Sequence, residues 1–228
     1  MRPRVIINMA MSLDGKVSSV AREPVNFTSR EDKKRLLQIR ARCDALVVGG
    51  TTARDYETMG IPDSRLRAAR ERRGQTPHPL RVIVSGRLNL PRDLRVFHAP
   101  ISPLLLVCCE KAAVARRRFF ARFGRVMVRG RDEVNIQRLV SILALEYHVR
   151  TVLCEGGPTL NDAFFRAGLV DELYLTLCPR VVGGQNAPTL VDGIGFRRLR
   201  DAPRGRLVSC RKGASEWFLR FRFDCKNK

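Results

Sequence analysis

Short apolar runs alternate with stretches of helical spacing along most of the chain. Each run has the length of a strand, and the residues between two runs repeat apolar positions three and four apart. The predicted strands are Arg4–Met9, Ala45–Val48, Arg81–Val84, Leu104–Cys108, Arg125–Val128, Thr151–Cys154 and Glu172–Leu177. Strands that alternate with helices form parallel sheets covered on both faces, so the pattern indicates an α/β fold with a mostly parallel sheet.

The segments between the strands carry recognisable helix signals. Ser29 is a typical N-cap residue, and Asp32 three positions later predicts an approximate capping box. The helix that follows places Leu36, Ile39 and Cys43 on one face. Further helices are predicted within residues 110–121, around Ile136, Leu139, Val140 and Leu143 with Asp132 as the cap, and around Leu160, Ala163, Phe164 and Ala167.

The C-terminal part departs from this alternation. Arg206–Cys210 and Glu216–Phe223 are strand-like runs separated by a short segment that contains Gly213. Such a connection predicts an antiparallel hairpin at the edge of the sheet. We therefore expect residues 1–228 to form one α/β domain that ends in this hairpin.

Charge is the feature of the composition that changes the picture. The 228 residues include 43 Lys and Arg against 22 Asp and Glu, a formal net charge of +21. This charge favours anionic partners such as phosphorylated metabolites, nucleotides or nucleic acid. Aromatic residues make up only 7% and basic residues are spread along the chain, so specific nucleic-acid binding is not expected. No apolar run is long enough to cross a membrane, and a cytoplasmic location is expected.

The cysteines and histidines give no metal signal. The seven cysteines are Cys43, Cys108, Cys109, Cys154, Cys178, Cys210 and Cys225, and none lies in a C-x-x-C pair. Most end or flank strand-like runs, which favours small buried residues over a zinc site or a disulfide framework. The histidines lack metal-ligand spacing, so no bound metal is expected.

Residues 58–80 form a long basic connection between two predicted strands. Glycines and prolines bracket a short segment of helical character that Ser64 can cap. The segment carries Arg65, Arg67, Arg70, Arg72 and Arg73. Long connections in compact domains are often functional, and the alternative is a solvated surface excursion.

Polar residues follow the first predicted strand. Ser12, Asp14 and Lys16 occupy a loop at its carboxyl end, where open α/β sheets bind ligands. A simple Asp-Gly turn is the alternative interpretation of this loop.

Two turns combine a strand end, paired glycines and a predicted helix start. They are Val48-Gly49-Gly50-Thr51-Thr52 and Glu155-Gly156-Gly157-Pro158-Thr159. Glycines let the backbone approach a phosphate, and the N–H groups of a helix start point at it. Neither turn is a P-loop or a G-x-G-x-x-G fingerprint. Two such turns indicate an extended ligand with more than one phosphate, and Glu155 either binds a polar substrate or caps the helix.

Taken in their order along the chain, these stretches resemble the pyrimidine reductase of riboflavin biosynthesis. The motifs that carry the resemblance are Asn8 to Lys16, Ser29 with Arg40 and Asp44-Ala45, Val48 to Thr52, Arg81 to Ser85, Glu155 to Asn161, and Val182 to Gly184 with Asp192-Gly193. The family occurs as a free-standing enzyme and as the C-terminal domain of a bifunctional deaminase–reductase. The resemblance implies the fold of dihydrofolate reductase.

The resemblance also implies an activity and partners. The family reduces a pyrimidinone ribosylamine 5′-phosphate with NADPH, by hydride transfer to C1′ of the opened ribose, and is usually a homodimer. Another substrate of the same fold, such as dihydrofolate, a pterin or a related imine, is the main alternative, and a basic nucleic-acid-binding protein is the third hypothesis.

Site residues carry over from the family only where the motifs match. The cofactor-binding set is Gly49, Thr52, Ile83, Val84, Ser85, Gly156, Gly157, Pro158 and Thr159. The residues expected around the substrate are Ser12, Asp14, Lys16, Ser29, Arg40 and Glu155. Asp14, Lys16 and Glu155 are the catalytic candidates, and either Asp14 or Lys16 orients or protonates the substrate.

The chain departs from the family pattern after the first glycine turn. Asp55 stands one position early, and Ser85 occupies a position where the family often has Asp. The arginine that binds the substrate phosphate has no counterpart by position. Arg65 or Arg67 of the basic connection is a candidate substitute, because a guanidinium can bind phosphate with two hydrogen bonds.

Overall fold

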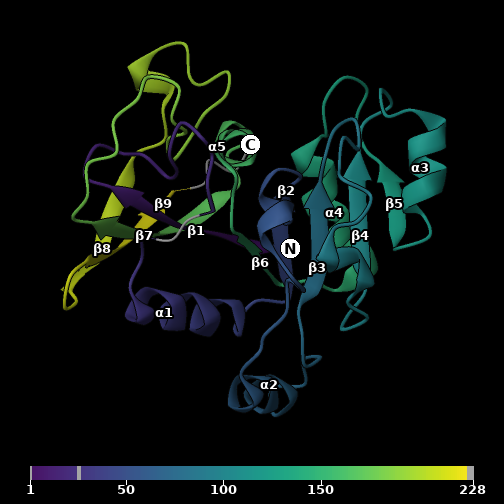
Figure 1. Ribbon diagram of the computed structural model, residues 1–228, viewed down its shortest axis with the longest axis horizontal. Coiled ribbons are helices and arrows are strands. Elements are labelled where there is room, and N and C mark those ends of the chain that lie inside the picture. Colours follow the sequence, from purple (N-terminus) through teal and green to yellow (C-terminus); the bar gives the residue numbers. More distant parts are fainter. Residues whose placement is uncertain (1, 25–26, 225–228) are drawn as a thin grey trace. The chain divides into compact units, whose positions relative to one another are not determined.

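The computed structural model describes residues 2–24 and 27–224, and its chain is organised as two compact units (Figure 1). Unit 1 consists mainly of Leu37–Leu153. Unit 2 combines Arg4–Leu36 with the residues from Cys154 onward. Cys225 lies outside the described residues. The nine strands form the mostly parallel sheet with antiparallel C-terminal strands that the sequence predicts.

Unit 1 is built on parallel strands in the order β5-β4-β3-β2-β6. The strands are β2 (Ala45–Gly49), β3 (Leu80–Val84), β4 (Leu104–Cys108), β5 (Arg125–Val128) and β6 (Thr151–Cys154). The helices are α2 (Ser64–Glu71), α3 (Val114–Phe120) and α4 (Ile136–Tyr147), with short 3-10 turns η1 (Thr52–Asp55) and η2 (Arg95–His98). All of β4 is buried, which explains its uninterrupted apolar sequence.

Unit 2 has the strand order β1-β7-β9-β8. The strands are β1 (Arg4–Ser12), β7 (Val170–Cys178), β9 (Trp217–Phe223) and β8 (Gly205–Lys212), and the helical elements are α1 (Arg30–Arg40), α5 (Pro158–Arg166) and the 3-10 turn η3 (Leu199–Asp201). β1 and β7 are parallel, whereas β9 and β8 form the predicted antiparallel hairpin.

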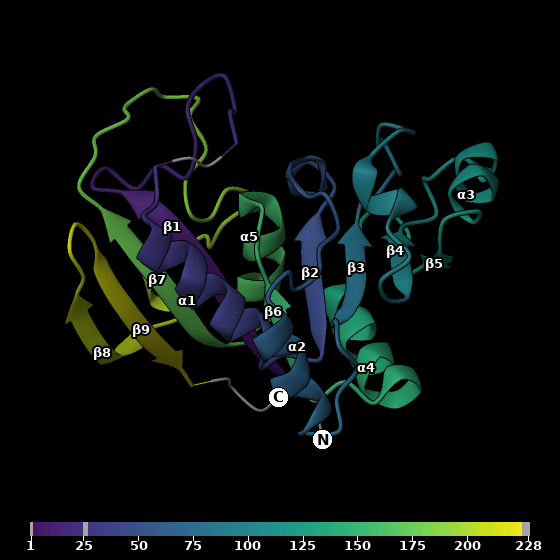
Figure 2. The same cartoon turned by 60° about the horizontal axis from the view of Figure 1, so that its bottom comes forward.

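Helix α1 begins over the face of unit 2 formed by β7 and β9 (Figure 2). The guanidinium of Arg35 stacks on the rings of Tyr174 and Phe218, 5.3 and 4.9 Å from their centroids. On α5, the ring of Phe165 meets Phe223 of β9 edge to face, with centroids 5.2 Å apart. Cation–π and aromatic contacts of this kind tie both helices to the sheet.

Several helix starts differ from those predicted. Asp63, not Ser64, caps α2 by accepting hydrogen bonds from the N–H groups of Arg65 and Leu66. Asn135, not Asp132, caps α4. Asp63 lies one position before Ser64, and Asn135 lies three positions after Asp132. Asp, Asn and Ser give the same cap signal in a sequence, so the cap type was predictable and its position was not. After the first glycine turn, the expected helix is only the four-residue η1.

Most cysteines are buried, as the sequence predicts. Cys43, Cys108, Cys109, Cys154 and Cys178 are buried free thiols. Cys210 is an exception to that prediction, because every residue of β8 after Gly205 is exposed. Burial raises the pKa of both the Cys154 and the Cys178 thiol to about 12.

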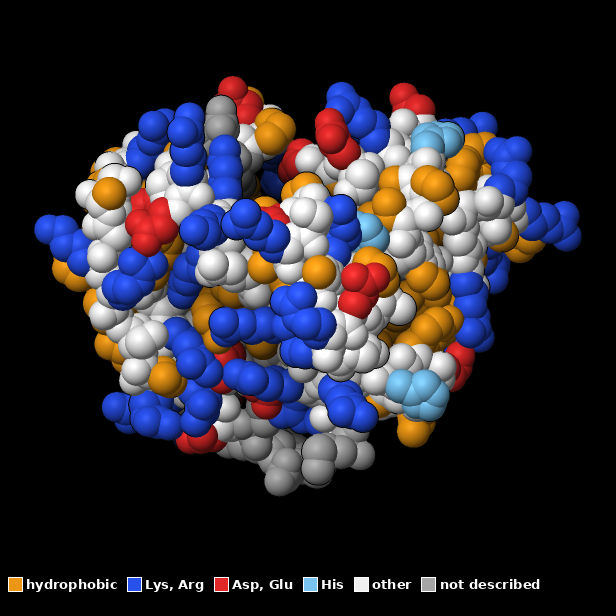
Figure 3. All heavy atoms as spheres, turned by 90° about the horizontal axis from the view of Figure 1, so that it is seen from below, with side chains coloured by type: hydrophobic (Ala, Val, Ile, Leu, Met, Phe, Trp, Pro, Cys, Tyr) orange, Lys and Arg blue, Asp and Glu red, His pale blue; other side chains and the backbone are white. Residues whose placement is uncertain are grey.

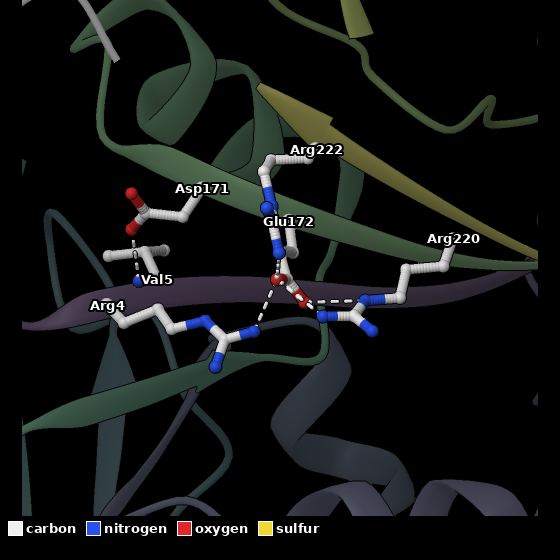
Figure 4. Close-up of polar contacts among 6 residues, drawn as sticks. All are labelled: Arg4, Val5, Asp171, Glu172, Arg220 and Arg222. Atoms are coloured by element: carbon white, nitrogen blue, oxygen red, sulfur yellow. Dashed lines mark hydrogen bonds and ion pairs between the residues drawn. The ribbon is translucent and has the colours of Figure 1, made fainter. Parts of the chain in front are cut away.

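A buried carboxylate joins three strands of unit 2 (Figure 4). Glu172 at the start of β7 is 2% exposed and accepts two hydrogen bonds from Arg220, at 2.8 and 3.0 Å. Arg4 of β1 donates to the same carboxylate, and Arg222 of β9 lies 3.7 Å from it. Beside them, the carboxylate of Asp171 accepts from the N–H of Val5 at 2.7 Å. One acid thus balances part of the charge of three arginines.

The basic connection 58–80 is anchored at the amino end of β2. Arg70 is almost fully buried, and its guanidinium donates to the carbonyls of Ala41, Cys43 and Thr76. Arg67 donates to the carbonyls of Ile61 and Pro62 in its own loop. Arg70 thus satisfies backbone carbonyls at the edge opposite the glycine turn that follows β2, whereas Arg67 is bonded within its own loop. This position argues against the expectation that the connection clamps a substrate phosphate.

The surface is basic without a single concentrated patch on the face drawn in Figure 3. Lys and Arg side chains are spread over much of that face, with acidic side chains among them. Within the described residues, no helix is long and apolar enough to cross a membrane.

Candidate active site

The loop after β1 is held by a compact hydrogen-bond network. The Ser12 hydroxyl donates to Asp14 at 2.6 Å and accepts from the N–H of Lys16 at 2.9 Å. Ser12 is 0% exposed, so it shapes the loop from within. The backbone of Lys16 also forms an isolated antiparallel bridge with Thr189. The predicted Asp-Gly turn is therefore present, and it holds two charged side chains at the carboxyl end of β1.

Asp14 connects this loop to the segment after β7. Its carboxylate accepts from the N–H groups of Val182 and Gly183, at 3.0 and 2.7 Å. Gly183 adopts φ +70°, a left-handed conformation that favours glycine. The hydrogen bond from Ser12, followed by those from Val182 and Gly183, lowers the pKa of Asp14 to about 2. Asp14 is thus an exposed, ionised carboxylate at neutral pH, which can orient a ligand but has no proton to donate.

The ammonium group of Lys16 has more N–H donors than it uses in this loop. Its ammonium group donates to the carbonyl of Ala187 at 3.3 Å. An ammonium group carries three N–H donors, so the geometry allows it to hold a ligand oxygen or nitrogen as well. Lys16 is half-buried, in keeping with a side chain whose stem packs on the loop.

The second glycine turn leads from β6 into α5. Gly156 has φ +84°, and a Cβ atom there would lie 2.9 Å from the sulfur of Met9, so only glycine fits. The peptide bond between Gly156 and Gly157 is cis. Gly157 is the N-cap of α5, no side chain caps this helix start, and Pro158 is in the first turn as predicted. Pro158 has no N–H, and the N–H of Leu160 donates to the carbonyl of Gly157 at 2.9 Å, so Thr159 supplies the N–H of this first turn that an anion could use.

Glu155 and Thr159 flank this turn on either side. Glu155 is buried directly after β6, whereas Thr159 is exposed in the first turn of α5. Asn161, fully buried one turn along α5, donates to the carbonyl of Leu190 at 2.9 Å. This bond ties α5 to the segment before Asp192-Gly193, the last of the motifs singled out in the sequence.

Ser29 begins α1, as the sequence predicts, but its partners differ from a capping box. Its hydroxyl accepts from the N–H of Asp32 at 3.1 Å. The N–H of Ser29 donates to the carboxylate of Glu216 at 2.6 Å, and not to that of Asp32. Asp32 instead accepts from the hydroxyl of Thr176 at 2.6 Å. The capping box is thus closed by a residue far along the chain.

In unit 1, the first glycine turn lies beside the end of β3. Gly49 is paired with Val84, and a Cβ atom at Gly50 would lie 3.1 Å from the hydroxyl of Ser85. Thr52 is half-exposed at the start of η1. Gly49, Thr52, Val84 and Ser85 therefore gather at one edge of unit 1, as a phosphate- or nucleoside-binding edge requires.

Two other predicted residues of unit 1 are buried. Ile83 is 0% exposed, and its side chain belongs to the core of unit 1. Arg40, the last residue of α1, is 6% exposed; its guanidinium donates to the carbonyl of Gly60 at 2.6 Å and lies over the ring of Tyr56. Arg40 thus holds the start of the basic connection.

Sequence reasoning missed a basic cavity at the same edge of unit 1. The cavity has a volume of about 360 Å³ and is lined by Arg54, Arg92 and Arg116, which follow β2, β3 and β4 respectively. Arg92 stacks on the ring of Phe119, 4.6 Å from its centroid. Arg116 donates to the carbonyl of Arg87 at 3.3 Å. The three arginines follow three neighbouring strands of the sheet. Arginine is too common in this chain for the sequence alone to single them out.

Among the residues that the structure describes, no three His, Cys, Asp or Glu side chains are grouped as metal ligands.

Comparison with known proteins identifies the family. The sequence matches the RibD C-terminal domain over residues 3–219. The chain belongs to the RibD C-terminal domain family. The sequence-based resemblance is therefore confirmed.

Two curated relatives of this RibD C-terminal domain protein match it over most of their own length. The 2,5-diamino-6-ribosylamino-4(3H)-pyrimidinone 5′-phosphate reductase of Archaeoglobus fulgidus is 34% identical over 197 residues, covering 86% of this chain and 89% of the relative. The protein of the same name from Methanothermobacter thermautotrophicus is 34% identical over 204 residues, 90% of each chain. These names support a reductase, and hence an oxidoreductase, of riboflavin biosynthesis.

Solved structures confirm the fold. A pyrimidine reductase-like protein from Corynebacterium diphtheriae matches with a TM-score of 0.83 at 20% identity, covering 97% of this chain and 92% of that chain. Dihydrofolate reductase from Enterococcus faecalis matches with a TM-score of 0.51 at 11% identity, covering 97% and 96%. The dihydrofolate reductase-like fold predicted from the sequence is therefore correct.

Proposed function

We propose that this protein is an NADPH-dependent reductase that converts the ribosylamino group of a pyrimidinone ribosylamine 5′-phosphate into a ribitylamino group. The observation that carries this proposal is the family match over residues 3–219, together with relatives of that activity name that are 34% identical over most of the chain. The motifs that match lie in both units, at the carboxyl ends of strands, where ligands bind in this class of fold.

The reaction needs a hydride, a proton and residues that bind the substrate phosphate. NADPH supplies the hydride, which adds to C1′ of the opened, imine-like sugar, and the imine nitrogen takes up the proton. The residues of this chain have three tasks: to hold the cofactor, to hold the substrate and to supply that proton. Close placement of the reacting atoms accounts for much of the rate enhancement in such a reaction.

The residues of each unit fit the phosphates of a dinucleotide. In unit 2, the start of α5 offers the backbone N–H of Thr159 beside the turn of Gly156 and Gly157. In unit 1, the cavity of Arg54, Arg92 and Arg116 offers guanidinium groups at the edge that carries Ser85. Arginine distinguishes the 2′-phosphate of NADPH from the 2′-hydroxyl of NADH. We therefore propose that this cavity selects NADPH.

The loop after β1 supplies the proton and orients the substrate in this proposal. Asp14, with its pKa lowered to about 2, is ionised at neutral pH and cannot be the acid. Lys16 carries ammonium protons in the same loop and is assigned the role of proton donor. Asp14 is assigned the orientation of a substrate hydroxyl or amino group, and Glu155 remains a proposed substrate ligand.

The decisive experiment follows NADPH oxidation by the purified protein with 2,5-diamino-6-ribosylamino-4(3H)-pyrimidinone 5′-phosphate, with its deaminated counterpart and with dihydrofolate. Turnover with either pyrimidine supports the proposal, and the ratio of the two rates gives the order of reduction and deamination. Turnover with dihydrofolate alone would move the substrate to the pterin class. Failure to bind NADPH would refute the proposal as a whole.

The cofactor and assembly parts of the proposal have separate tests. Arg92→Gln and Arg116→Gln are expected to raise KM for NADPH about tenfold and to leave KM for NADH within about twofold. We also propose a homodimer, which light scattering from the protein in solution checks directly.

A further inference from the structure

The Ser29 hydroxyl has a fixed hydrogen-bond polarity. Its hydrogen is donated to one oxygen of Glu216 at 2.5 Å, and one of its lone pairs accepts from the N–H of Asp32 at 3.1 Å. A serine hydroxyl has one hydrogen and two lone pairs, so one lone pair is left. In this arrangement Ser29 can accept a further hydrogen bond but cannot donate one.

Glu216 is built into the structure to hold Ser29. It is 4% exposed, and its second oxygen accepts from the N–H of Ser29 at 2.6 Å. The thiol of Cys178 donates to this second oxygen at 3.5 Å. Glu216 immediately precedes β9, and its carbonyl accepts from the N–H of Gly213, which closes the β8–β9 connection. The β8–β9 hairpin therefore places the buried carboxylate of Glu216 beside Ser29.

Asp32 cannot replace Glu216 in this role. Its carboxylate is turned to Thr176, whose hydroxyl also accepts from the guanidinium of Arg35 at 3.2 Å. Burial, to which the nearby charge of Glu216 adds, raises the pKa of Asp32. The two buried acids beside the start of α1, Asp32 and Glu216, thus have different partners.

Ser29 lies at the ligand-binding edge of unit 2. In the parallel pair of β1 and β7, Ser12 is opposite Cys178, and Cys178 contacts Glu216. This chain of contacts places Ser29 at the same carboxyl edge as the loop of Asp14 and Lys16. Ser29 is half-exposed, so part of this residue is accessible to a ligand.

We propose that Glu216 is a positioning residue that makes Ser29 an obligatory acceptor, so that Ser29 recognises an N–H or O–H group of the substrate. This inference rests on the proposed function and states which kind of substrate group Ser29 binds, namely a hydrogen-bond donor. A phosphate dianion has no hydrogen to offer and is excluded as the partner of Ser29. The amino and ribosyl hydroxyl groups of a diaminopyrimidinone ribosylamine phosphate have such hydrogens.

A glutamine at position 216 would reverse this polarity. If its carbonyl oxygen keeps the Ser29 N–H, its amide nitrogen faces the Ser29 hydroxyl and donates to it. The hydroxyl then accepts from both neighbours and turns its own hydrogen toward the substrate donor. In Glu216→Gln, the hydroxyl hydrogen of Ser29 therefore faces the N–H or O–H donor of the substrate, and the two donors repel each other. Ser29→Ala only removes one hydrogen bond.

The experiment measures kcat and KM for the pyrimidine substrate, with the dissociation constant of NADPH as a check of folding. We expect Ser29→Ala to raise KM about fivefold and Glu216→Gln to raise it at least about twentyfold. The double variant is expected to return to the value of Ser29→Ala, because the repelling hydroxyl is gone. NADPH binding stays within about twofold in all three variants.

Glu31→Gln is the matched control. Glu31 also joins the first turn of α1 to the hairpin, through Arg211 at 2.6 Å, but its pair is solvent-exposed and does not touch Ser29. The KM of Glu31→Gln for the pyrimidine substrate is expected to stay within about twofold of the wild-type value.

Two outcomes separate this inference from the function on which it rests. An unchanged KM in Glu216→Gln, or a double variant worse than both single variants, would leave Glu216 a structural residue and refute the inference alone. Glu216→Asp, which keeps the carboxylate, checks the same point if the glutamine variant does not fold: a KM as high as that of Ser29→Ala or higher, with normal NADPH binding, would count against the inference. Absence of turnover by the wild-type protein would refute the proposed function and the inference together.

Discussion

The buried carboxylate of Glu172 offers a direct measure of what holds β1, β7 and β9 together. Replacing it by glutamine keeps the shape of the side chain and removes the charge. Arg220 then loses one of its two charged hydrogen bonds, and Arg4 and Arg222 lose the anion toward which they converge (Figure 4). Three guanidinium groups are left close together without the carboxylate that they share.

The cost follows from burial on each side of the cluster. Breaking a fully buried pair costs about 3–5 kcal/mol because the remaining charge is stranded. Glu172 is 2% exposed, but the arginine side chains are 28–48% exposed and regain water when the acid is removed. We therefore expect Glu172→Gln to lower the free energy of unfolding by about 2–3 kcal/mol. For a chain of this size, Tm falls by roughly 4–12 °C.

The pH dependence of this loss has a definite sign. Burial acts to raise the pKa of Glu172, but the hydrogen bonds from Arg220 and Arg4 outweigh it, so the net pKa is below the ordinary value. The stabilisation is then fully present above the unfolded pKa of about 4.3 and is lost as pH falls through the lower folded value. The gap between wild type and variant is expected to be constant from about pH 7 to pH 5 and to close below about pH 4.

Urea unfolding, followed by circular dichroism and by the fluorescence of the single tryptophan, Trp217 in β9, measures the difference. Glu57→Gln is the control, because its pair with Arg95 is 74–75% exposed and contributes about 0–1 kcal/mol. A loss below about 1 kcal/mol in Glu172→Gln, or a gap that widens in acid, would show that the reasoning about burial is wrong.

The remaining predictions concern the site, the basic connection and the thiols. Asp14→Asn is expected to lower kcat at least about tenfold with little change in NADPH affinity; unaltered kcat would remove Asp14 from the mechanism. Arg65→Ala is expected to leave substrate KM unchanged, and a rise in KM would support the hypothesis that the basic connection binds the substrate phosphate. Arg70→Met is expected to lower the free energy of unfolding by about 2–4 kcal/mol. Iodoacetamide near pH 8 is expected to label Cys210 in the native protein and to spare Cys154, which peptide mapping checks.

Local patterns predicted the fold well. Strand and helix periods, the hairpin around Gly213 and the two glycine turns depend on neighbours within a few residues, and the structure confirms them. Cap positions at Asp63 and Asn135 were missed by one to three residues, because several polar residues near a helix start give the same signal.

The candidate site was predictable only where its residues share a loop. Asp14 and Lys16 were singled out correctly as loop residues, but the N–H groups that hold Asp14 belong to Val182 and Gly183, far along the chain. Glu216 carries no local signal that links it to Ser29. Contacts between distant segments depend on tertiary packing, and a single sequence does not contain that information in readable form.

The division of the chain into units also sets the order in which the protein can be completed during synthesis. Leu37–Leu153 is continuous in sequence, so every strand pairing of unit 1 can form once the ribosome has passed Leu153. Unit 2 begins at Arg4 but needs β9, which ends at Phe223. At about 5–20 residues per second, the last strand of unit 2 is therefore synthesised roughly 4–14 s after the last strand of unit 1. During that interval β7 lacks its partner β9 and exposes an unpaired strand edge, which is a site for aggregation in a nascent chain.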